Sequence, residues 1–216
     1  MTEIAPDGSP VLLYASLPSL GEARLIHEEV PAGSQILELG AGAGRITHEL
    51  IGLGHQVAAV DNSAEMLAFI RGAETLLADM ETLSLERRFP VVVLASNFIN
   101  TPDPHNRRTF LECCARHVLP SGQVLLQGFP RAWAPDTEWS RHGDVRLRLR
   151  RYELDGALIS GEMQYEVGGH ELFHVFESRL LTDEELDADL SAVGLRRRRS
   201  LDERGAWTEA VPESRS

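Results

Sequence analysis

Lysine is absent from the 216-residue sequence, and all 21 basic residues are arginine. Without lysine the chain cannot form the Schiff base on which pyridoxal phosphate enzymes and lysine-dependent aldolases rely. It also cannot supply the phosphate-binding lysine of a P-loop. These enzyme classes are therefore excluded before any motif is considered.

Cysteine is scarce as well: the chain has two, Cys113 and Cys114, side by side in a helical pattern. Neighbouring side chains on a helix point about 100° apart, so a bridge between these two would be strained. We therefore expect reduced, buried thiols in a cytoplasmic protein. The sequence shows no basic-then-apolar leader and no apolar run of about 18 residues, so neither secretion nor membrane insertion is expected.

Positive charge is in short supply, with 21 basic against 33 acidic residues, a formal net charge of -12 and a pI of about 5.1. An acidic protein repels phosphate backbones, so nucleic acid is not an expected partner. Two arginine runs, at residues 146–151 and 196–199, are interpreted as solvated strand faces, with an acidic acceptor or partner as the alternative. The composition is otherwise that of an ordinary globular chain.

Strands and helices are predicted to alternate over the first 128 residues. Helical spacing of apolar residues predicts helices at residues 18–30, 46–53, 63–71 and 107–118. Short apolar runs predict strands at residues 35–39, 56–60, 75–78, 89–95 and 122–127. Such alternation predicts an α/β fold with a doubly wound, mostly parallel sheet.

The pattern changes after Gly128, where alternating apolar and polar residues predict antiparallel strands. Thr182 and Glu185 then form a capping box at the start of a closing helix, followed by a predicted hairpin of residues 195–200 and 207–211. We expect one domain, 1–216, in four parts. These are an N-terminal arm at 1–17, a core at 18–128, a strand-rich elaboration at 129–178 and a closing helix and hairpin at 179–216.

A glycine-rich turn follows the first predicted strand, with the sequence Glu38-Leu39-Gly40-Ala41-Gly42-Ala43-Gly44. The NAD fingerprint G-x-G-x-x-G would require a third glycine at position 45 or 47, where Arg45 and Thr47 stand. A pyrophosphate also favours a helix N-terminus without a neighbouring carboxylate, whereas Glu38 precedes this turn. The pattern therefore argues against a dinucleotide and favours a ligand that carries positive charge.

Several motifs occur in an order and spacing that resemble the class I, Rossmann-like S-adenosylmethionine-dependent methyltransferases of small-molecule type. The motifs are residues 36–47, 60–67, 77–80, 90–95 and 119–123, and the resemblance covers about residues 20–128. It implies S-adenosylmethionine as the cofactor and S-adenosylhomocysteine as the product. It also implies a seven-stranded sheet, in which the antiparallel insertion follows the fifth strand and covers the acceptor site.

The resemblance also implies a set of cofactor-binding residues. Glu38 would organise the turn, Asp61 would hold the ribose hydroxyls, and Asp79 would accept from the adenine amino group. Tyr14, from the N-terminal arm, would cover the cofactor, with simple packing as the alternative. The remaining implied contacts are Gly40, Ala41, Gly42 and Gly44 in the turn, Asn62, Met66 and Met80 at the adenine, and Ser96 and Asn97 at the methionyl end.

Histidines are the candidate general bases, which a methyl transfer needs only where the nucleophile starts protonated. The candidates are His105, His170 and His174. The string from His170 to His174 matches the zinc motif H-E-x-x-H, but that chemistry requires a helix and the flanking alternation predicts a strand. No metal is therefore expected. The strand face that carries these histidines either lines an acceptor pocket or is half-exposed.

The sequence thus predicts methyl transfer to an oxygen, nitrogen or carbon nucleophile of a small metabolite, by a monomer or homodimer. The string Asn-Pro-Pro-Tyr, which marks amino-methylating enzymes of nucleic acids and proteins, is absent after the fourth strand. A peptide acceptor stays open. Two alternatives also remain: an S-adenosylmethionine enzyme of another reaction type, such as cyclisation, and a non-catalytic Rossmann-like binding module.

Overall fold

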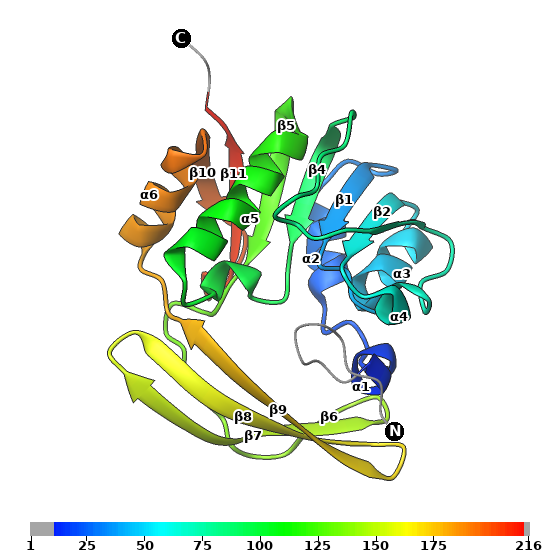
Figure 1. Cartoon of the computed structure of the whole chain (residues 1–216), viewed down its shortest axis with the longest axis vertical. Helices are drawn as coiled ribbons and strands as arrows, with labels where there is room; N and C mark the ends of the chain where they lie inside the picture. Colours follow the sequence, from blue (N-terminus) through cyan, green and yellow to red (C-terminus); the bar gives the residue numbers. More distant parts are fainter. Residues whose placement is uncertain (1–10, 214–216) are drawn as a thin grey trace.

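Two sheets of different construction make up the protein, in a computed structural model that describes residues 11–213 (Figure 1). The larger sheet has seven strands in the order β10-β11-β5-β4-β1-β2-β3. Strands β1 to β5 run parallel, and β11 is antiparallel to both of its neighbours. The strands are β1 (Gln35–Leu39), β2 (Gln56–Asp61), β3 (Glu74–Leu77), β4 (Phe89–Leu94), β5 (Val118–Gln127), β10 (Leu195–Ser200) and β11 (Trp207–Pro212).

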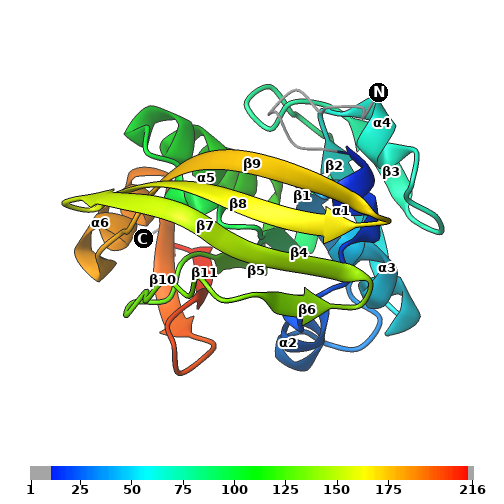
Figure 2. The same cartoon turned by 90° about the horizontal axis from the view of Figure 1, so that it is seen from below.

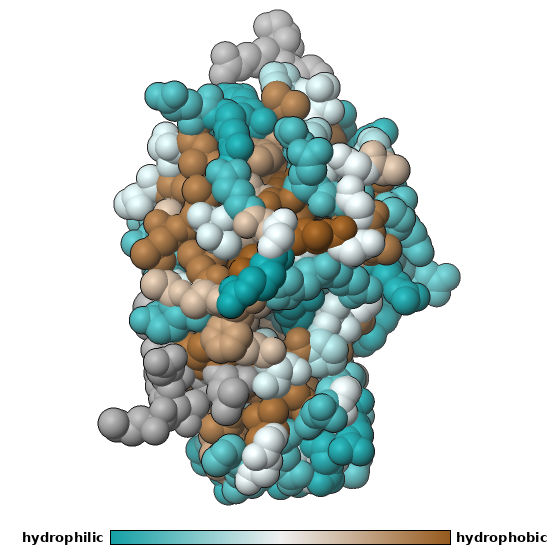
Figure 3. Space-filling view, turned by 90° about the vertical axis from the view of Figure 1, so that its right-hand side faces the viewer, coloured by the Kyte–Doolittle hydropathy of each residue, from teal (hydrophilic) through white to brown (hydrophobic). Residues whose placement is uncertain are grey.

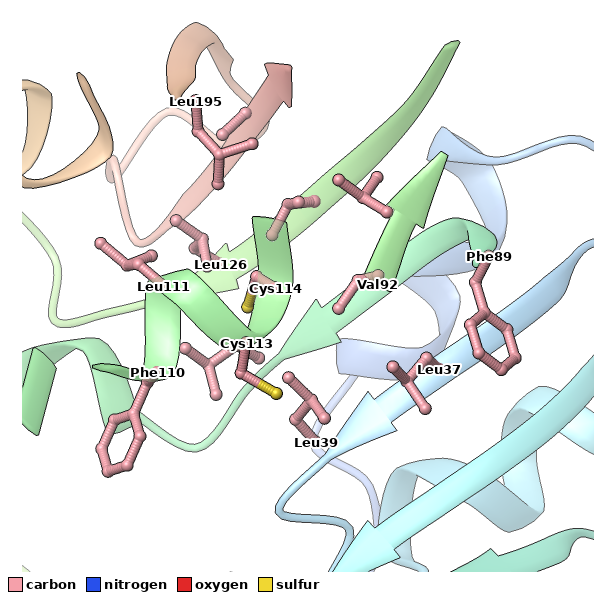
Figure 4. Packing of buried hydrophobic residues seen from close by; sticks show 14 of the residues in the cluster. Leu37, Leu39, Phe89, Val92, Phe110, Leu111, Cys113, Cys114, Leu126 and Leu195 are labelled. Carbon is pink, nitrogen blue, oxygen red and sulfur yellow. The ribbon is translucent and has the colours of Figure 1, made fainter. Parts of the chain in front are cut away.

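Helices cover both faces of this sheet, as the sequence predicts. Helices α2 (Glu22–Glu29) and α3 (Arg45–Gly52) pack on one face, and α5 (Pro104–His117) and α6 (Asp183–Ala192) pack on the other. Figure 4 shows Leu39 and Val92 of the sheet beside Cys113 and Cys114 of α5. Both cysteines are free and buried, which confirms the predicted reduced pair.

Three shorter elements lie near the carboxyl ends of the parallel strands. They are α1 (Val11–Ser16), α4 (Ala64–Leu67) and the 3₁₀ turn η1 (Phe98–Asn100). Ser63 caps α4 as predicted, because its hydroxyl accepts from the Met66 amide at 3.1 Å. The helix is shorter than the predicted 63–71, since the amides of Phe69 and Ile70 bond three residues back and tighten the chain into turns.

The predicted insertion after the fifth strand is a separate four-stranded antiparallel sheet, β6-β7-β8-β9. Its strands are β6 (Ser140–His142), β7 (Val145–Asp155), β8 (Leu158–Val167) and β9 (His170–Arg179). Figure 2 shows this sheet lying across the end of the larger unit, and in Figure 3 it forms the narrower lower lobe. It is held there partly by α1, whose Leu13 is buried against Val145 and Tyr165.

The closing elements also match the sequence predictions. The Thr182 hydroxyl accepts from the Glu185 amide, and the Glu185 carboxylate accepts from the Thr182 amide, which completes the capping box of α6. Strands β10 and β11 form the expected antiparallel hairpin. Part of the predicted arm, residues 1–10, lies outside the described residues. Within residues 11–213, no helix is long and apolar enough to cross a membrane.

Candidate functional site

A cavity of about 450 Å³ lies between the carboxyl ends of β1, β2 and β4 and the inner side of β9. Its size falls within the range of small-molecule sites, roughly 300–1,000 Å³. The place is the one where open α/β sheets bind ligands, because β1 and β4 are neighbours whose following loops diverge to opposite faces. One wall therefore comes from the larger sheet and the other from the insertion.

The glycine-rich turn after β1 forms the floor of the cavity. Gly40, Gly42 and Gly44 have φ angles of 68°, 55° and 87°, in the left-handed region that favours glycine. A Cβ atom at Gly40 would also lie 2.4 Å from the Phe98 ring, so a side chain there would displace Phe98. The turn can thus present its backbone closely to a ligand.

Asp61 fixes this turn from the end of β2. One carboxylate oxygen accepts from the Gly42 amide at 2.8 Å, and the other accepts from the Ser63 amide at 2.9 Å. The carboxylate therefore joins the glycine turn to the start of α4. On the same side of the cavity, the Asn62 amide donates to Asp79 at 3.1 Å, and Met66 is buried.

Glu38 lies beneath the turn with 2% of its surface exposed. Burial raises the pKa of this carboxyl to about 7, although the Thr47 hydroxyl donates to it at 2.6 Å and Arg45 lowers the value. The carboxyl is therefore poised between its neutral and charged forms near neutral pH. A cation bound in the cavity would favour the charged form.

Arg45, the first residue of α3, is a cavity residue that motif reasoning did not predict. Its side chain is only 16% exposed and pairs with the buried Glu22 at 2.5 Å, and a second nitrogen donates to the Ser96 hydroxyl at 3.3 Å. Burial alone would raise the pKa of Glu22, but Arg45 and the Leu20 amide hold it below its ordinary value. Arg45 is the one arginine in the cavity lining, among the residues described.

The opposite wall comes from α1 and β9. Tyr14 and His174 meet edge to face with ring centroids 6.5 Å apart, and Glu177 and Ser178 continue the wall along β9. Across from them, Ser96 and Asn97 follow β4 with φ angles of 56° and 61°. Left-handed backbone at residues other than glycine is strained and is often found at functional sites.

Most of the sequence-predicted residues meet in this cavity. Those that line it are Tyr14, Glu38, Gly40, Ala41, Gly42, Asp61, Asn62, Met66, Met80, Ser96, Asn97 and His174. Those that the structure places outside its lining are Gly44, Asp79, His105 and His170.

The four residues outside the lining have local reasons for their positions. Gly44 turns the chain into α3, and a Cβ atom there would lie 2.8 Å from Ile70. Asp79 faces Asn62. His105 lies exposed in the first turn of α5, and His170 lies exposed at the start of β9. The structure therefore brings one of the three candidate bases, His174, to the cavity.

Sequence reasoning missed other lining residues, some of them inside the recognised motifs and the rest from segments that no motif marks. They are Ala43, Arg45, Ile46, Ala78, Glu81, Phe98, Thr101, Phe110, Glu177 and Ser178. The sequence did carry a signal for Arg45 and for the two β9 residues. Arg45 is the residue that breaks the NAD fingerprint, and Glu177 and Ser178 continue the strand on which His174 was predicted.

The histidine string at residues 170–174 forms part of β9, so its two histidines do not share one helical turn. This confirms the predicted strand. In the described part of the chain, no group of three or more histidine, cysteine, aspartate or glutamate side chains is placed to hold a metal ion.

Comparisons with known proteins identify the family that the chain resembles. Residues 36–122 match a family model described as a methyltransferase domain. An N,N-dimethyltransferase of dTDP-3-amino-3,6-dideoxy-alpha-D-glucopyranose from Streptomyces fradiae is 28% identical over 189 residues, which are 80% of this chain and 74% of that protein.

Two further relatives differ in how much they share with the chain. A ubiquinone biosynthesis O-methyltransferase from Xanthomonas oryzae is 28% identical over 110 residues, only 46% of this chain and 45% of that protein. An amino pentose methyltransferase from Micromonospora echinaspora, solved with S-adenosylmethionine bound, has a TM-score of 0.70. It is 20% identical, with 95% of this chain and 92% of that chain covered, so this likeness concerns the fold.

Proposed function

We propose that this chain, a class I S-adenosylmethionine-dependent methyltransferase, methylates the amino group of a small, sugar-like metabolite. The observation that supports this acceptor is the β9 wall, where His174 and Glu177 both line the cavity above the glycine turn. Such a wall suits an amine, because the carboxylate attracts the ammonium form and the imidazole can accept a proton. The relative that matches 80% of the chain is named as an amino-sugar N,N-dimethyltransferase.

The residues of the cavity fit the cofactor by charge. S-adenosylmethionine carries a sulfonium, an ammonium and a single carboxylate. Glu38 and Asp61 lie near the turn, so they would balance the cationic end and hold the ribose hydroxyls, respectively. Arg45 would bind the cofactor carboxylate, because it is the one arginine of the lining and retains donor capacity beyond its bonds to Glu22 and Ser96.

The other proposed cofactor contacts follow from their positions in the lining. The backbone of Gly40, Ala41 and Gly42 would follow the methionyl and ribose groups, with Gly44 shaping the turn. The adenine would be enclosed by Asn62, Met66 and Met80. Asp79 would act through Asn62, because its carboxylate accepts a hydrogen bond from the Asn62 side-chain amide. Tyr14, Ser96 and Asn97 would border the site of transfer.

When bound, S-adenosylmethionine supplies an electrophilic methyl group and leaves as S-adenosylhomocysteine. The chain's own contribution is alignment and the exclusion of water. His174 would take the proton that the amine loses, so that the nitrogen lone pair is free to form the new bond to carbon as the bond from sulfur to carbon breaks. Tyr14, whose ring contacts that of His174 edge to face, would hold the imidazole in place.

O-methylation is the second candidate, because a ubiquinone biosynthesis O-methyltransferase also matches. It is less favoured, since that match covers less than half of either chain, whereas the amino-sugar enzyme matches over most of both.

The two free, buried cysteines fit the predicted cytoplasmic location. Monomer or homodimer stays a prediction.

Product analysis on matched acceptors tests the proposal. The purified chain is given S-adenosylmethionine and either a 3-amino-3,6-dideoxyhexose, free or linked to a nucleoside diphosphate, or the same sugar with hydroxyl in place of the amine. We expect S-adenosylhomocysteine and methylated product from the amine only. If the hydroxyl sugar or a phenol is methylated and the amino sugar is not, N-methylation is contradicted. Methylthioadenosine as the product would indicate cyclisation instead.

A further inference from the structure

Asn100 is a buried polar residue at the end of η1 that no motif singles out. Its side chain is 3% exposed, and both ends of its carboxamide bond to backbone from distant parts of the chain. The Phe129 amide donates to its oxygen at 3.0 Å, and its nitrogen donates to the Arg179 carbonyl at 2.7 Å. The carboxamide oxygen and nitrogen therefore bond to two segments that are about fifty residues apart in sequence.

These two segments are the connections between the larger unit and the four-stranded sheet. The chain leaves the seven-stranded sheet after Gln127, and it returns from β9 at Arg179 before entering α6 (Figure 1). One side chain thus ties the outgoing and the returning connection to each other. Gly128 lies so close that a Cβ atom there would be 2.9 Å from the Asn100 oxygen.

The same short element also touches the cofactor side of the cavity. Phe98, two residues before Asn100, lies so close to Gly40 that a Cβ atom there would overlap its ring. On the other side, Glu177 and Ser178 line the cavity immediately before Arg179. Asn100 therefore lies on a short path between the glycine turn and the β9 wall, and both ends of that path face the cavity.

We propose that Asn100 is a positioning residue, which sets the distance between the β9 wall and the cofactor. The proposal rests on the proposed function, because that function places the acceptor against β9. Methyl transfer depends on alignment of the nucleophile with the methyl group, and a misplacement of about 1 Å can cost about 100-fold in rate. Releasing β9 should impair transfer and leave cofactor binding intact.

Two variants release the same contact in different ways. Asn100→Asp keeps the oxygen that accepts from Phe129 but turns an acceptor toward the Arg179 carbonyl. Gly128→Ala keeps Asn100 and pushes its carboxamide aside. In both we expect acceptor kcat/KM to fall on the order of 100-fold, with the Kd for S-adenosylhomocysteine changed by less than about twofold. Hydrogen exchange of residues 170–180 should be faster, and that of β1 and β4 unchanged.

Gln123→Ala is the matched control. Its side-chain amide also bridges to a backbone carbonyl, that of Glu29 at 3.0 Å, but on the helix α2 side of the sheet. It should lower thermal stability without altering acceptor kinetics or exchange in β9. The exchange measurement needs no acceptor. It therefore tests the contact of Asn100 with the two connections even if the proposed amino-sugar acceptor is wrong. Unchanged exchange in β9, or faster exchange with unchanged acceptor kinetics, would overturn the proposal.

Discussion

Arg45 has a structural contact with Glu22 and a proposed role in binding the cofactor carboxylate. Its partner Glu22 is nearly buried, so the guanidinium is held in one orientation before any ligand binds. A charge-assisted hydrogen bond contributes about 1.5–3 kcal/mol, so we expect Arg45→Ala to raise the Kd for S-adenosylhomocysteine about 10- to 100-fold. Calorimetric titration measures this. Arg24→Ala, which removes an exposed partner of Glu49, is the control and should bind normally.

His174 is the one candidate base that the structure brings to the cavity. His174→Asn should lower kcat for the amine acceptor by about 100-fold or more, since a positioned general base contributes about 10²- to 10⁴-fold. Cofactor affinity should not change. His105→Asn and His170→Asn are matched controls, because both histidines lie outside the cavity lining. An undiminished His174→Asn enzyme would refute the assignment.

Glu38 should make cofactor binding depend on pH. Its pKa of about 7 in the folded chain is above the ordinary value of 4.5, so the unliganded protein should lose stability as pH rises from 4.5 to 7. A cationic ligand favours the ionised form, so affinity for S-adenosylmethionine should increase between pH 6 and 8. Glu38→Gln should flatten this profile. An identical profile in that variant would show that another group titrates.

At the scale of elements, a buried ion pair joins α5 to α6. Arg107 bonds to Asp189 at 2.5 Å, and Arg107 also donates to the Thr101 carbonyl. Removing one partner leaves a buried charge, so Asp189→Ala should lower the free energy of unfolding by about 3–5 kcal/mol in urea denaturation. Glu74→Ala breaks an exposed pair with Arg87 and should cost less than about 1 kcal/mol. Equal losses would contradict this reasoning.

Elements were predictable where local chemistry alone determines them. Thr182 and Glu185 cap α6 through each other's backbone, and the apolar run of β4 is typical of a buried strand. Two helix boundaries were missed although the signals for them are local. Helix α5 begins at Pro104 rather than Arg107, because Asp103 caps it and proline suits the first turn. Helix α4 ends early because turns replace its last residues.

At the scale of the whole molecule, the cavity joins two sheets, so ligand should stabilise both together. A ligand at 100 times its Kd adds about 2.7 kcal/mol to the stability of the folded state, which corresponds to roughly 5–11 °C in Tm for a chain of this size. Thermal melts with S-adenosylhomocysteine measure this shift. Arg45→Ala should lose about half of it or more at the same ligand concentration. No shift in the wild-type chain would contradict the proposed cavity.

The sequence by itself determined the cofactor side of this protein. Glu38 and the glycines lie at the end of β1, and Asp61 ends β2. Parallel strands bring their carboxyl ends to one edge, so order along the chain determines proximity in space. The acceptor side was decided only by tertiary structure. Tyr14 of α1 and His174 of β9 line the wall opposite the glycine turn, and their approach to it depends on how the insertion docks, which no local pattern encodes.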